Sequence, residues 1–120
     1  VTPAPGTLPS HYAPRATVEL VTRDELAARV DAHLADGVTV GVLCLVPLPT
    51  VDERAVVLDA PRDVDDYARV LYQRLRDADA CGVDVLLAVP PPAAGVGEAV
   101  VDRLRRAAGT RVNQAAGVET

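Results

Sequence analysis

A nearly continuous apolar run, Val38–Val46, restricts what this chain can fold into more than any other feature. Strands that are buried on both faces of a parallel sheet have this pattern, because helices cover both sides of such a sheet. The available core residues agree with a sheet. The chain has no Phe, Trp or Met, so its core volume comes from Val, Leu and Ala, and β-branched Val favours strands.

Segments with strand and helix patterns alternate along the rest of the chain. We expect strands at Thr17–Val21, Val38–Val46, Arg54–Leu58 and Asp84–Val89, and helices at about 22–36, 63–81 and 98–108. This order predicts an α/β, Rossmann-like layered domain in which helices flank a mostly parallel sheet of about four strands. The Pro47–Glu53 connection is short for a parallel crossover, so the strand order stays open.

Local signals mark the ends of the first two helices. Thr22 followed by Glu25 predicts a capping box at the start of the first helix. Gly37 and Gly82 are placed to end the first and second helices, since glycine adopts the left-handed conformation that follows many helices. The chain therefore divides into a Pro-rich linker (1–16), an α/β domain (17–109) and a tail (110–120).

Charge and composition exclude several classes of protein. A formal net charge of -5 argues against a general nucleic-acid binder, and no apolar run is long enough to span a membrane. We therefore expect no membrane partner. Cys44 and Cys81 lack metal-ligand spacing, which suits a reduced, cytoplasmic protein. The chain has no Met even at position 1, so we expect it to be a piece of a longer polypeptide.

The body of the domain offers little catalytic chemistry. His33 falls near the apolar face of the first helix and Cys44 inside a strand, so neither is predicted to be a ligand or nucleophile. A group of acidic residues could bind magnesium, but strand ends and helix starts favour Asp for structural reasons. This group consists of Asp59, Asp63, Asp65 and Asp66. We predict no catalytic residue and no metal site.

Two further features allow a binding role. Gly95 and Gly97 follow a strand and open a helix, where backbone N–H groups can bind an anion. The full G-x-G-x-x-G pattern is missing, and a tight turn between strand and helix is the favoured explanation of both glycines. The last helix ends in a basic group that suits either a solvated face or RNA contact: Arg103, Arg105, Arg106 and Arg111.

The first fourteen residues differ from the body. They contain four prolines and one glycine, which disfavour both helix and strand. They also hold the chain's only serine, Ser10, followed by His11 and Tyr12. A solvated spacer has no need for these side chains, so the segment is expected to contact something polar.

This segment resembles the linker of the two-domain threonylcarbamoyl-AMP synthases. The matching stretches are Ala4-Pro-Gly-Thr7 and Ser10-His-Tyr-Ala-Pro14, with Thr7 where Met is usual. The resemblance continues to residue 108 through motifs typical of the C-terminal domain in that family. These motifs are Asp63, Tyr67-Ala68, Leu71-Tyr72, Leu75-Arg76, Gly82-Val-Asp84, Gly95, Gly97 and Asp102-Arg-Leu-Arg-Arg-Ala-Ala108.

The resemblance implies a role in making threonylcarbamoyl-adenylate from threonine, bicarbonate and ATP, for tRNA modification. The family's catalytic domain uses Lys-x-Arg and Ser-x-Asn motifs, which a chain without Lys and with one Ser cannot contain. The chain is thus expected to be the linker and accessory domain, inactive by itself and without a cofactor. ATP and magnesium would belong to the parent enzyme, and its catalytic domain would be the partner.

In the resemblance, the linker lies over the catalytic pocket as a lid. The residues expected to contact the catalytic domain are Pro5, Gly6, His11, Tyr12 and Pro14. The alternative is that His11 and Tyr12 only hold the linker to its own domain. Two other functions stay open: a regulatory module that binds nucleotide at Gly95–Gly97, and a module that docks tRNA or another tRNA-modification protein.

Overall fold

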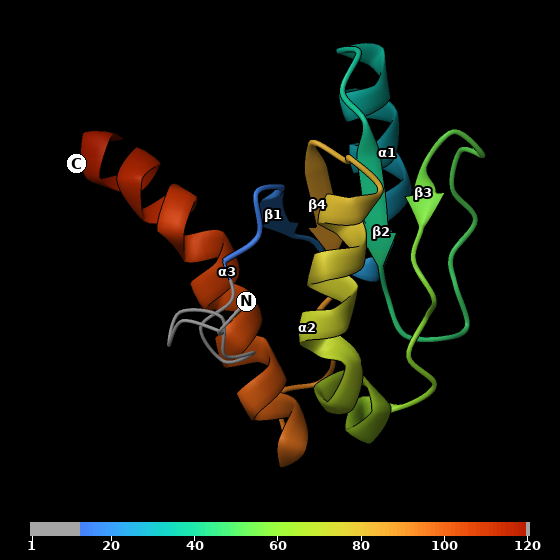
Figure 1. Ribbon diagram of the computed structural model, residues 1–120, viewed down its shortest axis with the longest axis vertical. Coiled ribbons are helices and arrows are strands. Elements are labelled where there is room, and N and C mark those ends of the chain that lie inside the picture. The colour runs from blue at the N-terminus through green and yellow to red at the C-terminus, as the bar shows by residue number, and fades with distance from the viewer. Residues whose placement is uncertain (1–12, 120) are drawn as a thin grey trace, which may run out of the picture.

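The computed structural model describes residues 13–119, with side chains to Ala108, and shows one layered α/β domain (Figure 1). The elements follow the order expected from the sequence. They are β1 (Thr17–Leu20), α1 (Arg23–Ala35), β2 (Val40–Leu43), β3 (Val56–Val57), α2 (Val64–Ala80), β4 (Val85–Ala88) and α3 (Val96–Glu119).

The four strands form one sheet in the order β1-β4-β2-β3, and every neighbouring pair is parallel. Val85 of β4 is in register with Thr17 on one side and Val40 on the other. All four residues of β2 are buried, as the apolar run predicts for a central strand. The predicted parallel α/β sheet is therefore confirmed, and the strand order that the sequence left open is settled.

The helices cover both faces of the sheet. The connection from β1 to β2 skips one position, and the connection from β3 to β4 skips one position in the opposite direction. Right-handed crossovers then place α1 and α2 on opposite faces (Figure 1). Two separate apolar clusters confirm this, one holding Leu26 and Val30 of α1, the other Leu71 of α2 with Leu104 of α3.

The predicted helix ends are confirmed in detail. Thr22 and Glu25 form a reciprocal capping box at the start of α1. Gly82 has φ +73°, and its N–H donates to the Asp79 carbonyl while the Val83 N–H donates to the Ala78 carbonyl. This is a Schellman motif, and Gly37 ends α1 in the same way.

Two elements differ from the prediction. β3 is shorter than the expected Arg54–Leu58 strand, because Arg54 and Ala55 donate their N–H groups to Asp52 in a turn. α3 begins at Val96 and runs to Glu119, so the predicted end at Ala108 is wrong, and residues 110–119 continue the helix instead of forming a tail. Gly109 lies inside this helix, where a single Gly costs only about 1 kcal/mol relative to Ala.

Candidate functional site

Most of the predicted lid residues lie outside the described part of the chain. Pro5, Gly6, His11 and Tyr12 fall within residues 1–12, and their contact with a catalytic domain stays a prediction. Pro14 is described and is buried. The linker can therefore be followed only where it joins the domain.

At this junction a carboxylate holds the backbone. The Arg15 N–H donates to both oxygens of Asp79, at 3.1 Å to Oδ1 and 3.0 Å to Oδ2. The Ala16 N–H donates to Oδ1 at 3.0 Å, and the Ala16 side chain is buried in the core. The Thr17 N–H then donates to the Asp84 carbonyl at 2.9 Å and starts β1. Three successive residues are thus fixed at the amino end of the sheet.

Asp79 occupies an unusual place for an acidic residue. It lies in the last turn of α2, which contains no basic side chain. The carboxyl end of a helix carries a partial negative charge, so a carboxylate there is normally unfavourable. Hydrogen bonds from two backbone N–H groups offset this cost. An acid in the last turn of a helix, where basic residues are usual, is the signal that could have pointed to this residue in the sequence.

The sequence pattern also did not predict a crevice at the opposite end of the sheet, where the strands end. The strands β1 and β4 are neighbours, and the helices that follow them, α1 and α3, lie on opposite faces. In open α/β sheets such a switch point is where ligands commonly bind. A cavity of about 390 Å³ is found there. It is lined by Val21, Thr22, Arg23, Leu45, Val89, Pro90, Pro91 and Pro92.

A second cavity of about 370 Å³ shares Val21, Thr22, Pro90 and Pro91 with the first. Glu25 and Arg105 also line it, on α1 and α3 respectively. The Glu25 carboxylate is already engaged, because it accepts the Thr22 N–H at 3.0 Å in the capping box. The crevice therefore has mainly apolar walls with a charged rim.

Arg23 closes the edge of the crevice beside β2. One guanidinium nitrogen, Nη1, donates to the Leu45 carbonyl and to Cys44 Sγ, both at 3.2 Å, and Nη2 donates to the Pro47 carbonyl. Burial raises the pKa of the Cys44 thiol, against a smaller lowering by the Arg23 charge. The thiol is therefore protonated at neutral pH, which is unsuitable for a nucleophile.

The other cysteine has a different environment. Cys81 is the C-cap residue of α2 and is exposed, whereas Cys44 is fully buried. Buried Tyr67, near the crevice, donates its hydroxyl to the Val89 carbonyl at 3.0 Å, and burial raises its pKa. Cys44 and Tyr67 thus act in packing, and only Cys81 presents its thiol to solvent.

The turn at Gly95 and Gly97 is explained by backbone geometry. Gly95 has φ +58°, and a Cβ on Gly97 would lie 2.0 Å from the Pro92 carbonyl oxygen. The Gly97 N–H donates to the Ala94 carbonyl at 3.0 Å, so it is engaged within the turn. These contacts favour the structural interpretation, and anion binding at Gly95 and Gly97 stays a prediction.

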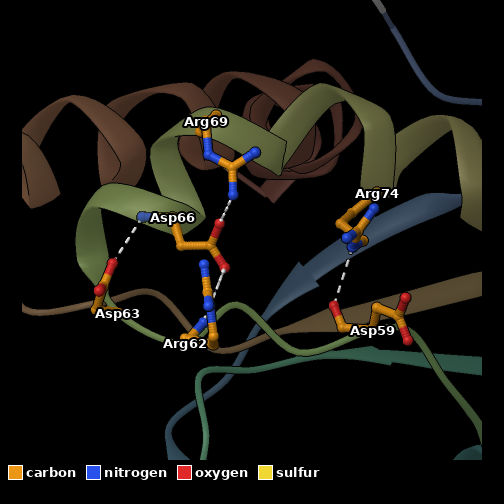
Figure 2. A network of polar contacts seen from close by, with 6 residues as sticks. All are labelled: Asp59, Arg62, Asp63, Asp66, Arg69 and Arg74. Atoms are coloured by element: carbon orange, nitrogen blue, oxygen red, sulfur yellow. Dashed lines mark hydrogen bonds and ion pairs between the residues drawn. The ribbon is translucent and has the colours of Figure 1, made fainter.

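The acidic group before and within α2 is organised by arginines (Figure 2). Asp63 caps the helix by accepting the Asp66 N–H at 2.8 Å. Asp66 accepts the Arg62 N–H at 3.0 Å and pairs with the guanidinium groups of Arg62 and Arg69. The Arg62 backbone bond, followed by the charge of Arg69, holds the pKa of Asp66 below its usual value.

These contacts leave the magnesium interpretation without support. Asp59 points its backbone carbonyl at Arg74, which donates Nε at 2.9 Å (Figure 2). Within residues 13–108, no three His, Cys, Asp or Glu side chains are arranged to hold a metal ion. His33 is also engaged, with Nε2 at 2.9 Å from Oε1 of Glu19.

The basic end of α3 contains an ion pair within the helix. Arg106 pairs with Asp102 at 3.2 Å, one turn earlier on the same helix. Among the described helices, none is long and apolar enough to cross a bilayer.

Comparisons with known proteins point to one family. A family model for the C-terminal domain of threonylcarbamoyl-AMP synthase matches residues 1–109. The threonylcarbamoyl-AMP synthase of Pyrococcus abyssi is 37% identical over 115 residues, which cover 91% of this chain and 33% of that protein. The Bacillus subtilis synthase is 32% identical over 119 residues, with the same coverage. The chain thus spans about a third of the length of these relatives.

Solved structures agree with the sequence comparison. P. abyssi Sua5 complexed with L-threonine matches with a TM-score of 0.69 and 35% identity, over 84% of this chain and 30% of that one. A P. abyssi Sua5 variant, in which adjacent His and Tyr residues are changed to Ala, matches with a TM-score of 0.71 and 33% identity, over 82% of this chain and 29% of that one. A C-terminal Sua5 domain from Pyrococcus horikoshii matches with a TM-score of 0.61 and 27% identity, over 76% of this chain and 91% of that one.

Proposed function

The chain belongs to the threonylcarbamoyl-AMP synthase C-terminal domain family, and from this premise we propose that it is the accessory domain of such an enzyme. The enzyme would convert threonine, bicarbonate and ATP into threonylcarbamoyl-AMP and pyrophosphate, for tRNA modification in the cytoplasm. The match over residues 1–109 carries this proposal, together with the coverage of only a third of each relative.

The catalytic domain of the same polypeptide is the partner that this role requires. ATP and magnesium would bind there, since the family's Lys-x-Arg and Ser-x-Asn motifs are absent from this chain. The accessory domain then acts through the linker. The composition around Pro5 and Gly6 predicts a semi-rigid linker with one hinge, and at about 3 Å per residue fourteen such residues would span roughly 40 Å.

The linker is proposed to be a lid on the catalytic pocket. His11 and Tyr12 would contact the pocket, with the Tyr12 hydroxyl and ring and the His11 ring nitrogens available for polar contacts. A closed lid excludes water from a reactive carbamoyl-adenylate and controls the release of pyrophosphate. The structure of a relative with adjacent His and Tyr changed to Ala shows that such a pair can be replaced in a folded protein.

The test compares the full-length polypeptide with the 120-residue chain in a pyrophosphate-release assay containing ATP, threonine and bicarbonate. We expect turnover from the full-length protein and none from the chain alone. In the full-length protein, His11→Ala and Tyr12→Ala should lower turnover while circular dichroism stays unchanged. Turnover by the isolated chain would refute the accessory role, and wild-type kinetics in both variants would refute the lid.

A second candidate is supported by the crevice at the ends of β1 and β4. Its position at a switch point suits a regulatory module that binds a small ligand such as a nucleotide. Because a related domain was solved separately, calorimetry with ATP or threonine on the 120-residue chain is a direct test. Heat of binding would support regulation, and its absence would leave the linker as the functional part.

Docking of tRNA is the remaining alternative. It depends on the basic end of α3, where Arg103 and Arg105 are exposed. A salt-dependent gel shift of tRNA by the 120-residue chain would support it, because phosphate contacts weaken steeply as salt rises. The net charge of -5 leads us to expect no shift.

A further inference from the structure

We propose that Asp79 is a positioning residue: it fixes the backbone at Arg15 and Ala16, where the linker joins the domain, and so sets the orientation of the domain that turnover by the proposed enzyme requires. This inference rests on the proposed function for its catalytic consequence. Its structural basis is independent, because it depends only on contacts within the described residues.

The contacts form a two-residue clamp. The Asp79 carboxylate accepts the Arg15 N–H with both oxygens and the Ala16 N–H with Oδ1, at 3.0–3.1 Å. These donors are more than sixty residues away in sequence, so the clamp joins the linker to the end of α2 rather than to a neighbouring turn. Hydrogen bonds to a charged acceptor are about twice as strong as neutral ones.

Apolar packing fixes the same junction from the other side. Pro14 is buried, and Ala16 is 2% exposed in the core cluster that also contains Ala78 of α2. The exposed residues Ala13 and Arg15 alternate with these two. The chain therefore enters the fold through a short extended segment, held by side-chain burial on one side and by the carboxylate on its N–H groups.

The helix itself does not need the Asp79 side chain. The last carbonyl groups of α2 are satisfied by N–H donors from Cys81, Gly82 and Val83. A carboxylate in this turn opposes the helix dipole, and the turn has no basic residue to compensate. Holding the linker junction is a role that suits an acid at this position.

A carboxylate is also the side chain best suited to this task. All its hydrogen-bonding sites are acceptors, and the backbone offers only donors at Arg15 and Ala16. An Asn whose oxygen took the place of Oδ1 would offer both N–H groups a single, uncharged acceptor, and its NH₂ group would face the Arg15 N–H where Oδ2 now accepts it. The isosteric change Asp79→Asn therefore weakens the clamp without removing volume.

The consequence for the reaction is geometric. With the clamp closed, residues upstream of Pro14 start from a fixed point beside the carboxyl end of α2. With the clamp weakened, the backbone at Arg15 and Ala16 samples more directions, so the domain is held less precisely relative to the proposed catalytic domain. Loss of orientation lowers turnover even when no reacting group changes.

The test uses the full-length polypeptide as wild type, Asp79→Asn, Asp79→Glu and a control, Asp36→Asn. Asp36 is the exposed C-cap residue of α1, so its replacement removes the same charge at a comparable helix end. Amide hydrogen exchange is measured at Arg15 and Ala16, with Leu86 in β4 as a core reference. Steady-state assays give kcat and the KM for ATP.

For Asp79→Asn we expect exchange at Arg15 and Ala16 to become about tenfold faster or more, the change expected when a charge-assisted hydrogen bond is lost. Exchange at Leu86 should stay within about twofold, as should the KM for ATP, while kcat falls by roughly threefold or more. Asp79→Glu, which keeps both acceptors, should recover part of kcat. Asp36→Asn should match wild type.

Unchanged exchange at Arg15 and Ala16 would overturn the clamp. Faster exchange there with wild-type kcat would overturn the positioning role, as would an equal rise of exchange at Leu86, which indicates general destabilisation. If the wild-type protein made no threonylcarbamoyl-AMP, the proposed function would fail. The exchange at Arg15 and Ala16 would still decide whether Asp79 fixes the junction.

Discussion

The two ends of the sheet are stabilised by different kinds of contact. At the amino end, carboxylates hold backbone N–H groups: Asp79 holds Arg15 and Ala16, and Asp84 Oδ2 accepts the Thr39 N–H at 3.2 Å. At the carboxyl end, buried apolar walls and close backbone approaches surround the crevice. A substitution at the amino end can therefore remove a single hydrogen bond, whereas a substitution at the carboxyl end disturbs close packing.

This difference places two roles at opposite ends of the sheet: ligand binding and attachment of the segment that precedes β1. Ligands of α/β sheets commonly bind at the carboxyl end. In this chain the segment before β1 enters the domain at the amino end of the sheet, where Asp79 lies. Substitutions at the carboxyl end are thus expected to lower the free energy of unfolding. Those at the amino end are expected to alter how the segment before β1 is held, with a smaller loss of stability.

The largest expected effect is at the carboxyl end, in Gly97→Ala. A Cβ at 2.0 Å from the Pro92 carbonyl oxygen forces the backbone apart, because a carbonyl cannot move like a flexible side chain. We expect a loss of about 2–4 kcal/mol in the free energy of unfolding, measured with urea on the 120-residue chain.

The matched control is Gly82→Ala. A Cβ on Gly82 meets nothing within 4 Å, so only its positive φ opposes the change. The expected cost is about 1 kcal/mol. Equal losses in the two variants would show that the contact with Pro92 does not limit the fold.

The next effect is expected for Tyr67→Phe. The change leaves the buried Val89 carbonyl without its 3.0 Å hydrogen bond. The free energy of unfolding should fall by about 1–2 kcal/mol at pH 7. Tyr72→Phe, on the same helix but only partly buried, is the control and should stay near wild type.

Alkaline pH provides an independent measurement on the same residue. Burial raises the pKa of Tyr67 and of the Cys44 thiol, so the unfolded chain loses these protons at a lower pH than the folded chain. The stability is complete below the ordinary pKa values and decreases as the pH rises above about 9–10. In Tyr67→Phe this decrease should be shallower. A steeper decrease would contradict burial of the phenol.

A smaller effect is expected at the amino end, for Asp84→Asn. The Asp84 side chain is exposed and contributes a hydrogen bond to the Thr39 N–H, and the backbones of the two residues pair independently of it. The loss of stability should be below about 1 kcal/mol. A loss as large as that of Gly97→Ala would remove the contrast between the two ends.

The smallest effect is expected for Asp66→Asn. Its carboxylate pairs with Arg62 and Arg69, whose exposed guanidinium groups are screened by water and salt, and an Asn oxygen can still accept the Arg62 N–H. The urea midpoint at pH 7 should be unchanged within error, with or without 0.5 M added salt (roughly a 4 Å Debye length). Since the pKa of Asp66 is lowered, any contribution exists above its unfolded pKa and disappears as the pH falls through the folded one.

The sequence predicted the parts of the fold that depend on local or periodic signals. The Val38–Val46 run indicated a central strand, and Thr22, Gly37 and Gly82 marked helix ends. Strand order depends on contacts distant in sequence, so the position of β4 between β1 and β2 could not be read from the pattern. The crevice depends on that position and was missed with it.

The candidate site was predictable to a smaller extent. The linker motif around His11 and Tyr12 identified the family, which the comparisons confirm. The sequence pattern did not single out Asp79, because an Asp on a helix surface is usually a solvated charge. Its importance depends on a backbone more than sixty residues away. Only the fold brings the two together.

The contrast between the two cysteines provides a practical tool. Cys44 is buried and Cys81 is exposed at the end of α2, two positions after Asp79. A thiol-reactive fluorophore or spin label should therefore attach at Cys81 in the native domain without any engineered cysteine. Paired with a second probe on the proposed catalytic domain, it would report the distance between the two domains in real time.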